Sequence, residues 1–260
     1  MNILEIESLT KTFGELKALD DLKLSIHAGV IFGLIGPNGA GKSTTINCIA
    51  DLLDNDSGVI KVFGKELKEA EIEIKKRMGI LFENTDDLFI YLKGEEHLRF
   101  VGEVYGLDKN TIEKRIDDLF DYFEIESHRQ MLIESYSKGM KKKIALASIL
   151  LHDPEFIILD EPFDGLDVFT IIKVKKILQQ LKAKGKTILI TSHILSYIED
   201  LTDEVGIIDK GKIVFQSPTK DIRSKIKNEI TQETYQSLEE IFLNVVKDSK
   251  EGEEKKLSWL

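Results

Sequence analysis

The sequence predicts an α/β fold in which a mostly parallel sheet is interrupted by a helical insert and then completed by further strands. Short, nearly continuous apolar runs such as residues 30–36 and 156–160 are typical of buried parallel strands. From about residue 95 to residue 151 the pattern becomes helical instead. In segment 115–123 the apolar residues repeat at the spacing of one helix face, namely Ile116, Leu119, Phe120 and Phe123.

The strands are expected in two groups, one on each side of the helical insert. Alternating apolar and polar residues predict the first two, and short apolar runs predict the others. In order, the expected strands are residues 3–9, 22–26, 30–36, 58–64, 78–82, 156–160, 187–191 and 204–209. A hairpin should follow the last strand and turn at Lys210–Gly211, and Pro218 should mark a break.

One more helix is predicted near the end of the chain, over residues 237–246. Ser237 and Glu240 have the spacing of a capping box. The apolar residues of this segment form one face, made of Leu238, Ile241, Phe242 and Val245. The residues after it, 247–256, are mostly charged and are expected to be solvated.

Composition and charge narrow the class of protein. The 260 residues include 36 Lys and Arg and 46 Asp and Glu, so the net charge is −10, which argues against a nucleic-acid backbone binder. The single cysteine, Cys48, excludes an intrachain disulfide and fits a reducing compartment. The N-terminal residues do not read as a signal peptide, and no window approaches 18 apolar residues. We therefore expect a globular protein that needs a partner to work at a membrane.

A glycine-rich motif joins a predicted strand to a predicted helix. It matches G-x-x-x-x-G-K-S and consists of Gly36, Pro37, Asn38, Gly39, Ala40, Gly41, Lys42 and Ser43, with Thr44 next. Glycines let the backbone turn its N–H groups toward an anion, and the helix N-terminus adds its positive end. Lys42 is expected to reach the β- and γ-phosphates of a nucleotide and Ser43 to hold Mg²⁺. The flanking strand and helix make a chance glycine-rich turn the weaker interpretation.

Two adjacent acids follow the apolar run at 156–159. Asp160 lies at the end of that predicted strand, where a carboxylate beside a phosphate loop can hold Mg²⁺ through water. Glu161 is positioned to orient or deprotonate a water that attacks the γ-phosphate. Adjacent acids after a strand are also common helix caps, but the phosphate loop favours the catalytic interpretation.

His193 directly follows the predicted strand 187–191. A lone histidine is more often structural, yet this one should lie at the same edge of the sheet as the phosphate loop. There its imidazole could hydrogen-bond the γ-phosphate.

These elements, in this order, resemble the ATP-binding subunit of ABC transporters, in its exporter-like branch. The resemblance covers residues 1 to about 217. Besides the phosphate loop and His193, it rests on the segment Tyr-Ser-Lys-Gly-Met at 136–140, on Leu-Asp-Glu-Pro at 159–162 and on Asp-Gly-Leu-Asp at 164–167. A phosphate loop alone indicates only a nucleotide-hydrolysing protein, whereas the combination is specific to this family.

The segment 136–140 aligns with the family's signature, usually Leu-Ser-Gly-Gly-Gln. The resemblance implies that Ser137 and Gly139 contact the γ-phosphate of ATP held by the opposite subunit. Lys138 replaces a glycine and Met140 replaces the glutamine. The signature helix is expected from about Met140 to Leu151, with Lys142 and Lys143 interpreted as part of a solvated lysine face.

Three further positions follow from the resemblance. Phe13 matches the aromatic residue that stacks on adenine. Asp167 belongs to a loop that crosses the dimer interface, in which Asp164 replaces the usual serine; a helix N-cap is the alternative role, and both can hold. Glu83 stands where the family commonly has a glutamine near Mg²⁺ and the attacking water, and we expect it on the metal side of the site.

The resemblance also implies a fold and a division of the chain. We expect a P-loop NTPase core of the RecA-like type, with an antiparallel β subdomain, over residues 1–83 and 152–217. An ABC-type α-helical subdomain with the signature should occupy residues 84–151. Residues 218–260 should form a C-terminal helical appendix and a charged tail.

The implied function is an ATP-driven clamp that powers transport, with ATP and Mg²⁺ as cofactors. Its expected partners are a membrane permease, facing segment 84–106, and a second ATP-binding subunit, identical or different, but no nucleic acid. We expect it at the cytoplasmic face of the cell membrane as a peripheral protein. A soluble ATPase of an assembly machinery, such as iron–sulfur cluster assembly, remains the alternative. A P-loop kinase or GTPase is disfavoured because the guanine motif N-K-x-D is missing.

Overall fold

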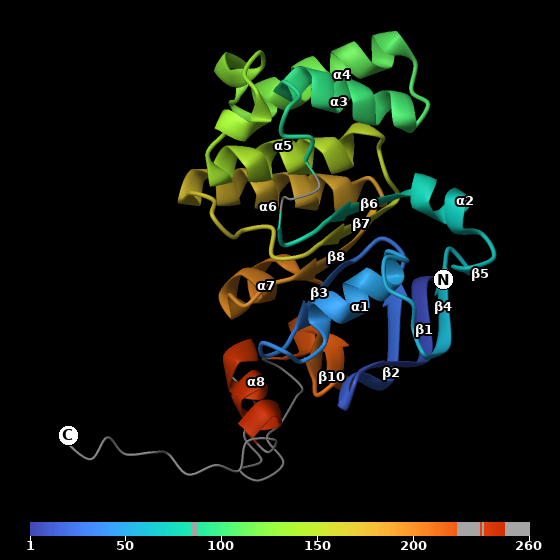
Figure 1. The fold of residues 1–260 in the computed structure, drawn as a ribbon. Coiled ribbons are helices and arrows are strands. Elements are labelled where there is room, and N and C mark those ends of the chain that lie inside the picture. Colours follow the sequence, from blue (N-terminus) through green and yellow to red (C-terminus); the bar gives the residue numbers. More distant parts are fainter. Residues whose placement is uncertain (85–87, 223–234, 236, 248–260) are drawn as a thin grey trace.

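The computed structural model describes residues 1–84, 88–222, 235 and 237–247. Two sheets and a group of helices stack along the long direction of the molecule, with the helical insert at one end and the N-terminal strands at the other (Figure 1). This confirms the expected α/β architecture.

The central sheet has six strands in the order β10-β9-β3-β8-β7-β6. All neighbours are parallel except the hairpin of β9 and β10. The strands are β3 (Ile31–Ile35), β6 (Met78–Leu81), β7 (Phe156–Leu159), β8 (Thr187–Thr191), β9 (Glu204–Asp209) and β10 (Lys212–Pro218). Because β3, β7 and β8 are neighbours and parallel, the residues that follow them meet at one edge of the sheet.

The second sheet is antiparallel and has the order β2-β1-β4-β5. Its strands are β1 (Asn2–Phe13), β2 (Leu16–His27), β4 (Ser57–Val62) and β5 (Lys65–Glu66). It supplies the expected antiparallel β part. The first two strands are longer than the sequence pattern predicted, since both continue to the turn at Gly14 and Glu15.

Helices cover the central sheet and form the insert. Between β6 and β7 lie α3 (Gly94–Val104), α4 (Lys109–Phe123) and α5 (Lys138–Leu151), with two short 3₁₀ turns, Glu126–His128 and Ile133–Ser135. The remaining helical elements are α1 (Lys42–Ile49), α2 (Glu71–Lys76), α6 (Val168–Ala183), α7 (Leu195–Leu201), the 3₁₀ turn Thr219–Asp221 and α8 (Leu238–Lys247). The signature helix was expected from Met140; it begins at Lys138, because Ser137 caps it.

Two hydrophobic cores lie on opposite faces of the central sheet. In β3, Ile31 and Ile35 belong to the core shared with the helical insert, whereas Phe32 and Leu34 belong to the core shared with the N-terminal sheet. This alternation follows from the period of two in a strand. All four residues are fully buried, so the sheet is covered on both faces, as continuous apolar runs predict.

The C-terminal helix packs on the core. Leu238 and Ile241 are buried in the core on the sheet face that the helical insert also covers, and the backbone N–H of Leu238 donates to the Glu199 carboxylate at 3.1 Å. The Ser237 hydroxyl accepts from the backbone N–H of Glu240 at 3.3 Å, which is one half of the predicted capping box. The charged tail, apart from Lys247, lies outside the described residues.

The β9–β10 hairpin turns where the sequence predicted. Lys210 and Gly211 have φ values of 46° and 77°, as a type I′ turn requires. Gly211 also donates to the carbonyl of Ala40 at 2.9 Å and accepts from the N–H of Asp20 at 3.1 Å. These two hydrogen bonds join the hairpin turn to the glycine-rich loop and to β2.

We predict that Gly211→Ala lowers the free energy of unfolding by roughly 2–4 kcal/mol. A Cβ there would lie 2.7 Å from the carbonyl oxygen of Ala18, and the positive φ adds about 1 kcal/mol of strain. Gly64→Ala is the matched control, because Gly64 has a φ of 74° but nothing within 4 Å of its Cβ position. Urea unfolding of both variants measures the difference, and equal losses would contradict the packing role of Gly211.

Candidate functional site

The glycine-rich loop runs between β3 and α1 and has little room for side chains. A Cβ at Gly36 would lie 2.3 Å from the carbonyl oxygen of Ile208. Gly41 precedes α1 with a φ of 113°, and a Cβ there would lie 2.8 Å from the carbonyl oxygen of Ala18. Glycine is therefore required at both ends of the loop, which brings its N–H groups and the N-terminus of α1 to one place.

Lys42 is buried beneath this loop. Its ammonium donates to the carbonyls of Gly36 at 2.7 Å and Pro37 at 3.2 Å. Burial lowers the pKa of Lys42, and the carboxylates of Glu161, Asp160 and Glu83 oppose that shift. The side chain is thus a cation held in place by backbone oxygens and surrounded by acids.

A single hydroxyl fixes the two acids that follow β7. Thr191, at the end of β8, is fully buried and donates to Oδ1 of Asp160 at 2.5 Å. The hydroxyl oxygen of Thr191 also accepts from the backbone N–H of Glu161 at 3.0 Å. Sequence analysis did not single out Thr191; the signal was a hydroxyl residue at the end of a strand that neighbours the acidic strand.

Glu161 and His193 contact each other directly. The carboxylate of Glu161 lies 3.0 Å from Nδ1 of His193 and also accepts from the backbone N–H of His193 at 3.3 Å. The Glu161 side chain is 13% exposed and that of His193 is 62% exposed. Glu161 has a φ of 46°, which is strained for a residue with a long side chain, and these contacts stabilise that conformation.

These groups line one cavity of about 750 Å³. Its walls consist of Phe13, Leu16, Ala18, Asn38, Gly39, Gly41, Lys42, Ser43, Thr44, Glu83, Asp160, Glu161, Asp164 and His193. Most of the residues that the sequence predicted for the site therefore meet here. Gly36, Pro37 and Ala40 belong to the loop but do not line the cavity. Leu16 and Ala18, which follow Phe13 along the chain, had not been identified from the sequence.

The three residues predicted on the metal side lie together. Ser43, Glu83 and Asp160 line this cavity and also a second one of about 350 Å³ that shares them. Within the described part of the chain, no group of three or more His, Cys, Asp and Glu side chains could hold a metal ion alone. Hydroxyl and carboxylate oxygens are donors that Mg²⁺ accepts, and it commonly takes only one or two carboxylates beside substrate phosphates. This donor set therefore fits Mg²⁺ shared with a nucleotide.

Ser137 and Gly139 lie outside this cavity. Both are at the start of α5, where the Ser137 hydroxyl accepts from the N–H of Met140 at 3.3 Å. Asp167 is also outside it and caps α6, accepting from the N–H of Thr170 at 3.0 Å. The cap interpretation of Asp167 is thus confirmed. One chain by itself does not bring these residues to its own nucleotide cavity.

The interpretation of Lys142 as a solvated residue is wrong. The residue is 2% exposed, and its ammonium donates to the carbonyls of Glu83 at 3.1 Å and Phe82 at 3.4 Å. Burial lowers the pKa of Lys142, against nearby carboxylates led by Asp164. A run of lysines hides such a residue, because only the fold shows which of them faces the core. Lys143 is half-buried.

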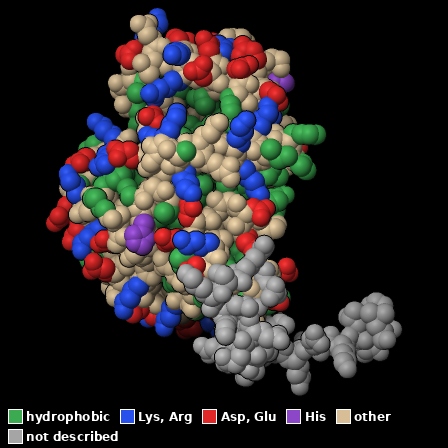
Figure 2. Space-filling model, turned by 180° about the vertical axis from the view of Figure 1, so that it is seen from behind, with side chains coloured by type: hydrophobic (Ala, Val, Ile, Leu, Met, Phe, Trp, Pro, Cys, Tyr) green, Lys and Arg blue, Asp and Glu red, His purple; other side chains and the backbone are tan. Residues whose placement is uncertain are grey.

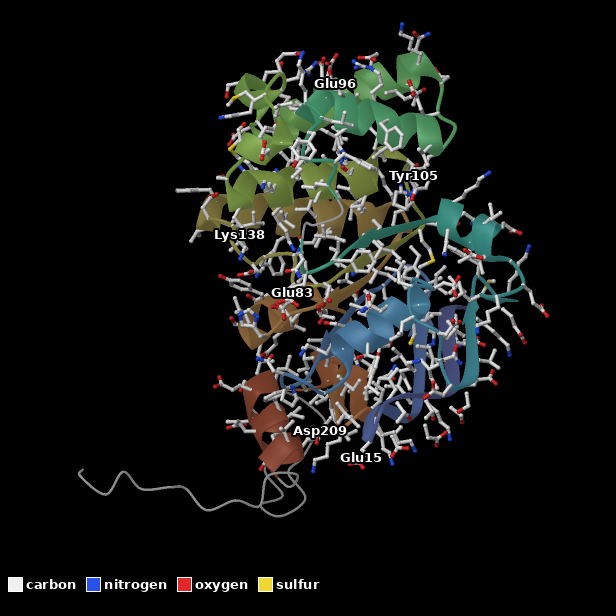
Figure 3. The ribbon with its side chains drawn as sticks, in the orientation of Figure 1. Glu15, Glu83, Glu96, Tyr105, Lys138 and Asp209 are labelled. Atoms are coloured by element: carbon white, nitrogen blue, oxygen red, sulfur yellow. The ribbon has the colours of Figure 1, made fainter. Side chains whose placement is uncertain are left out.

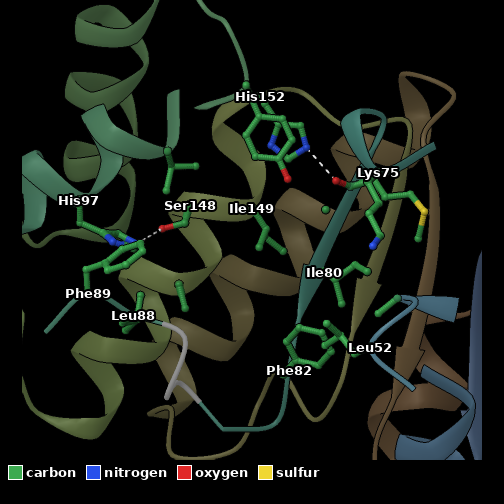
Figure 4. Close-up of a pocket in the computed structure, with 16 residues that line it drawn as sticks. Leu52, Lys75, Ile80, Phe82, Leu88, Phe89, His97, Ser148, Ile149 and His152 are labelled. Atoms are coloured by element: carbon green, nitrogen blue, oxygen red, sulfur yellow. Dashed lines mark hydrogen bonds between the residues drawn. The ribbon is translucent and has the colours of Figure 1, made fainter. Parts of the chain in front are cut away.

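A separate, mostly apolar groove of about 350 Å³ lies between α3, α5 and β6 (Figure 4). Leu52 and Phe89 line it and are at least half exposed, and Phe100 packs edge-on against Phe89. Nε2 of His97 lies 2.9 Å from the Ser148 hydroxyl, while its Nδ1 is buried without a hydrogen-bond partner. Such an exposed apolar surface around a groove is typical of a protein interface.

A strand–loop–helix phosphate cradle, with an acid at the end of a neighbouring strand, defines a P-loop protein that hydrolyses nucleoside triphosphates. The chain belongs to the ABC transporter family, because the family model described as ABC transporter matches residues 19–164, more than half of the chain. It is an ATP-binding subunit of this family and an ATPase.

Individual relatives agree with this assignment. The ABC transporter ATP-binding protein NatA of Bacillus subtilis (strain 168) is 36% identical over 213 residues, covering 82% of this chain and 87% of NatA. The Nod factor export ATP-binding protein I of Cupriavidus pinatubonensis is 33% identical over 222 residues, covering 85% of this chain and 67% of that protein. A solved structure of an ATP binding subunit of an ABC transporter superposes with a TM-score of 0.85 at 31% identity, covering 94% of this chain and 99% of that one.

The buried imidazole in the groove makes stability depend on pH. Burial lowers the pKa of His97 from 6.5 to about 4. Between these values the unfolded chain takes up a proton and the folded chain does not. Stability is therefore complete above pH 6.5 and falls by up to roughly 3 kcal/mol as the pH drops toward 4. We predict that His97→Gln shows a shallower loss of unfolding free energy between pH 6.5 and 4.5 than the wild type.

The comparison is between slopes, since His97→Gln also alters the contact with Ser148. His128→Gln, at a more exposed histidine, serves as the control and should keep the slope of the wild type. Urea unfolding at several pH values provides the measurement, and an unchanged slope in His97→Gln would refute this account.

Proposed function

We propose that the 750 Å³ cavity holds ATP as the nucleotide site of a transporter's motor subunit. The observation that carries this proposal is that three separate motifs, ending at Lys42, Glu161 and His193, place their charged groups around one cavity. The N–H groups of the loop and the Lys42 ammonium would bind the β- and γ-phosphates. Phe13, which is 48% exposed at the cavity wall, would stack on the adenine.

Hydrolysis would use the groups that Thr191 and His193 hold in place. Glu161 would accept a proton from the attacking water, and the His193 imidazole would contact the γ-phosphate. Ser43 and Asp160 would hold Mg²⁺, with Glu83 on the same side. The ion would neutralise the charge that develops on the transferred phosphoryl group. The contact of Glu161 with His193 holds both groups at the same side of the cavity.

Half of the predicted site is contributed by a second ATP-binding subunit. Ser137 and Gly139 lie at the start of α5, outside the chain's own cavity, and Asp167 lies in the loop next to them. In a dimer of opposed subunits they would contact the ATP of the partner. ATP binding would then bring two chains together and hydrolysis would release them, which provides two states for moving a membrane partner.

The apolar groove between α3, α5 and β6 is the proposed contact for a membrane permease. It includes Phe89 of the predicted partner-facing segment 84–106, with exposed aromatic residues at its edge. Through this contact the chain would attach to the cytoplasmic face of the membrane. No helix among the described residues is long and apolar enough to cross a bilayer. Export is the proposed direction, in keeping with the Nod factor export relative.

The alternatives receive less support. Relatives that are transporter subunits do not favour an assembly-machinery ATPase. The face seen in Figure 2 mixes acidic and basic side chains and shows no continuous basic stripe.

We predict that Glu161→Gln forms dimers with Mg-ATP on a sizing column and hydrolyses ATP at least 100-fold more slowly than the wild type. Loss of the carboxylate removes the proton acceptor while leaving the phosphate contacts in place. With Mg-ADP the same variant should stay monomeric. Lys42→Ala is the binding control and should lose ATP affinity.

ATP binding is measured in parallel, for example by equilibrium dialysis. If Glu161→Gln binds ATP but stays monomeric at saturation, and the wild type does not hydrolyse ATP, the proposed clamp is wrong.

A further inference from the structure

An ion pair joins the start of the signature helix to the loop after β7. The ammonium of Lys138, the first residue of α5, lies 2.7 Å from a carboxylate oxygen of Asp164. Lys138 is labelled in Figure 3, at the beginning of α5. Lys138 stands where the family usually has a glycine, and Asp164 stands where it usually has a serine. The two departures are therefore in contact and have opposite charge.

Gly165, the residue after Asp164, leaves room for the side chain of Lys138 in this ion pair. Gly165 has a φ of 74°, and a Cβ there would lie 3.1 Å from Cδ and Cε of Lys138. The stem of the lysine therefore lies across Gly165, which aims the ammonium at Asp164. A Cβ at Gly139 would in turn lie 3.2 Å from the carbonyl oxygen of Gly165. The helix start and the loop thus form one packed unit.

Stability is a poor explanation for this ion pair. The side chains of Lys138 and Asp164 are 72% and 44% exposed, and exposed ion pairs add little to the free energy of folding. A pair of this kind is also easily broken and reformed. The location of the ion pair, between the start of α5 and the loop after β7, suggests a role other than stability.

In the proposed dimer, the two members of the pair would face different nucleotides. Asp164 lines the cavity of its own chain, and Lys138 holds the pKa of this carboxyl below its usual range, so it stays ionised. Lys138 itself stands between Ser137 and Gly139, the residues that the proposed dimer presents to the ATP of the other chain.

We propose that Lys138 is a phosphate-contacting residue that each chain supplies to the ATP of a second copy, and that Asp164 is the partner it leaves in order to do so. This inference rests on the proposed function. Asp164 and the γ-phosphate compete for one ammonium. A dimer then forms at the cost of the ion pair, and the pair re-forms when the γ-phosphate is lost.

Competition predicts opposite effects from the two members of one pair. Lys138→Met keeps the stem over Gly165 and removes the charge, so it should weaken the ATP-dependent dimer about 10-fold or more. Asp164→Asn releases the ammonium and should strengthen the dimer roughly 3-fold or more. In the double variant the gain should vanish, because Asp164 acts only through Lys138.

The experiment measures the dimer dissociation constant by analytical ultracentrifugation with Mg-ATP, in full-length chains that all carry Glu161→Gln. Lys141→Met, the same charge change in the first turn of α5, is the matched control and should leave the constant within twofold. ATP affinity of the monomers and the urea midpoint are measured alongside, so that a folding defect is recognised. A dimer of the double variant that equals that of Lys138→Met alone supports the proposal.

Three results would overturn this inference alone. Equal losses in Lys138→Met and Asp164→Asn indicate a purely structural pair. A gain from Asp164→Asn that persists in the double variant, or an equal loss in Lys141→Met, indicates a general effect of charge. If Glu161→Gln itself binds ATP without forming dimers and the wild type does not hydrolyse ATP, the proposed function fails and this inference fails with it, whereas any of the three results above overturns the inference alone.

Discussion

The hydroxyl of Thr191 is the contact on which the geometry of the hydrolytic site depends. It joins the ends of β7 and β8 by donating to the carboxylate of Asp160 and accepting from the N–H of Glu161. Because it is fully buried, water does not compete for either bond. The methyl group of Thr191 is buried, while its hydroxyl makes both hydrogen bonds in the site. The backbone strain at Glu161 is tolerated because this contact and His193 both restrain that residue.

The sequence was sufficient for the fold class, for most of the strands and for the residues at the sheet edge. Buried parallel strands carry a strong pattern, and the polar residues that follow them, such as Asp160 and His193, must meet where neighbouring strands end. Thr191 was missed because a threonine within a β-rich run is ordinary. Lys142 was misjudged because periodicity within four lysines does not tell which one faces the interior. Its burial depends on the position of Glu83, some sixty residues earlier in the chain.

The residues assigned to the proposed nucleotide site fall into two groups. One group lines the chain's own cavity, and the other lies outside it. Lys42 and Glu161 are held by contacts within the chain, so the first group is preorganised. Ser137 and Gly139 are preorganised in a different sense, because the cap of α5 fixes their backbone while they lie outside the chain's own cavity. In the proposed dimer, ATP would control the arrangement of two chains rather than the shape of one. The division also explains why one chain's cavity shows only part of the residues that the motifs indicate.

The buried ammonium of Lys142 has a mechanical consequence. It lies on α5, one turn beyond Ser137 and Gly139. It donates to the backbone carbonyl of Glu83, which follows β6 and lines the cavity. An ammonium pulled away from both carbonyls without solvent would lose on the order of several kcal/mol. These two hydrogen bonds therefore couple α5 of the helical insert to the backbone at Phe82 and Glu83. Lys142 thus links α5, on the helical insert, to the backbone beside the cavity through two buried hydrogen bonds.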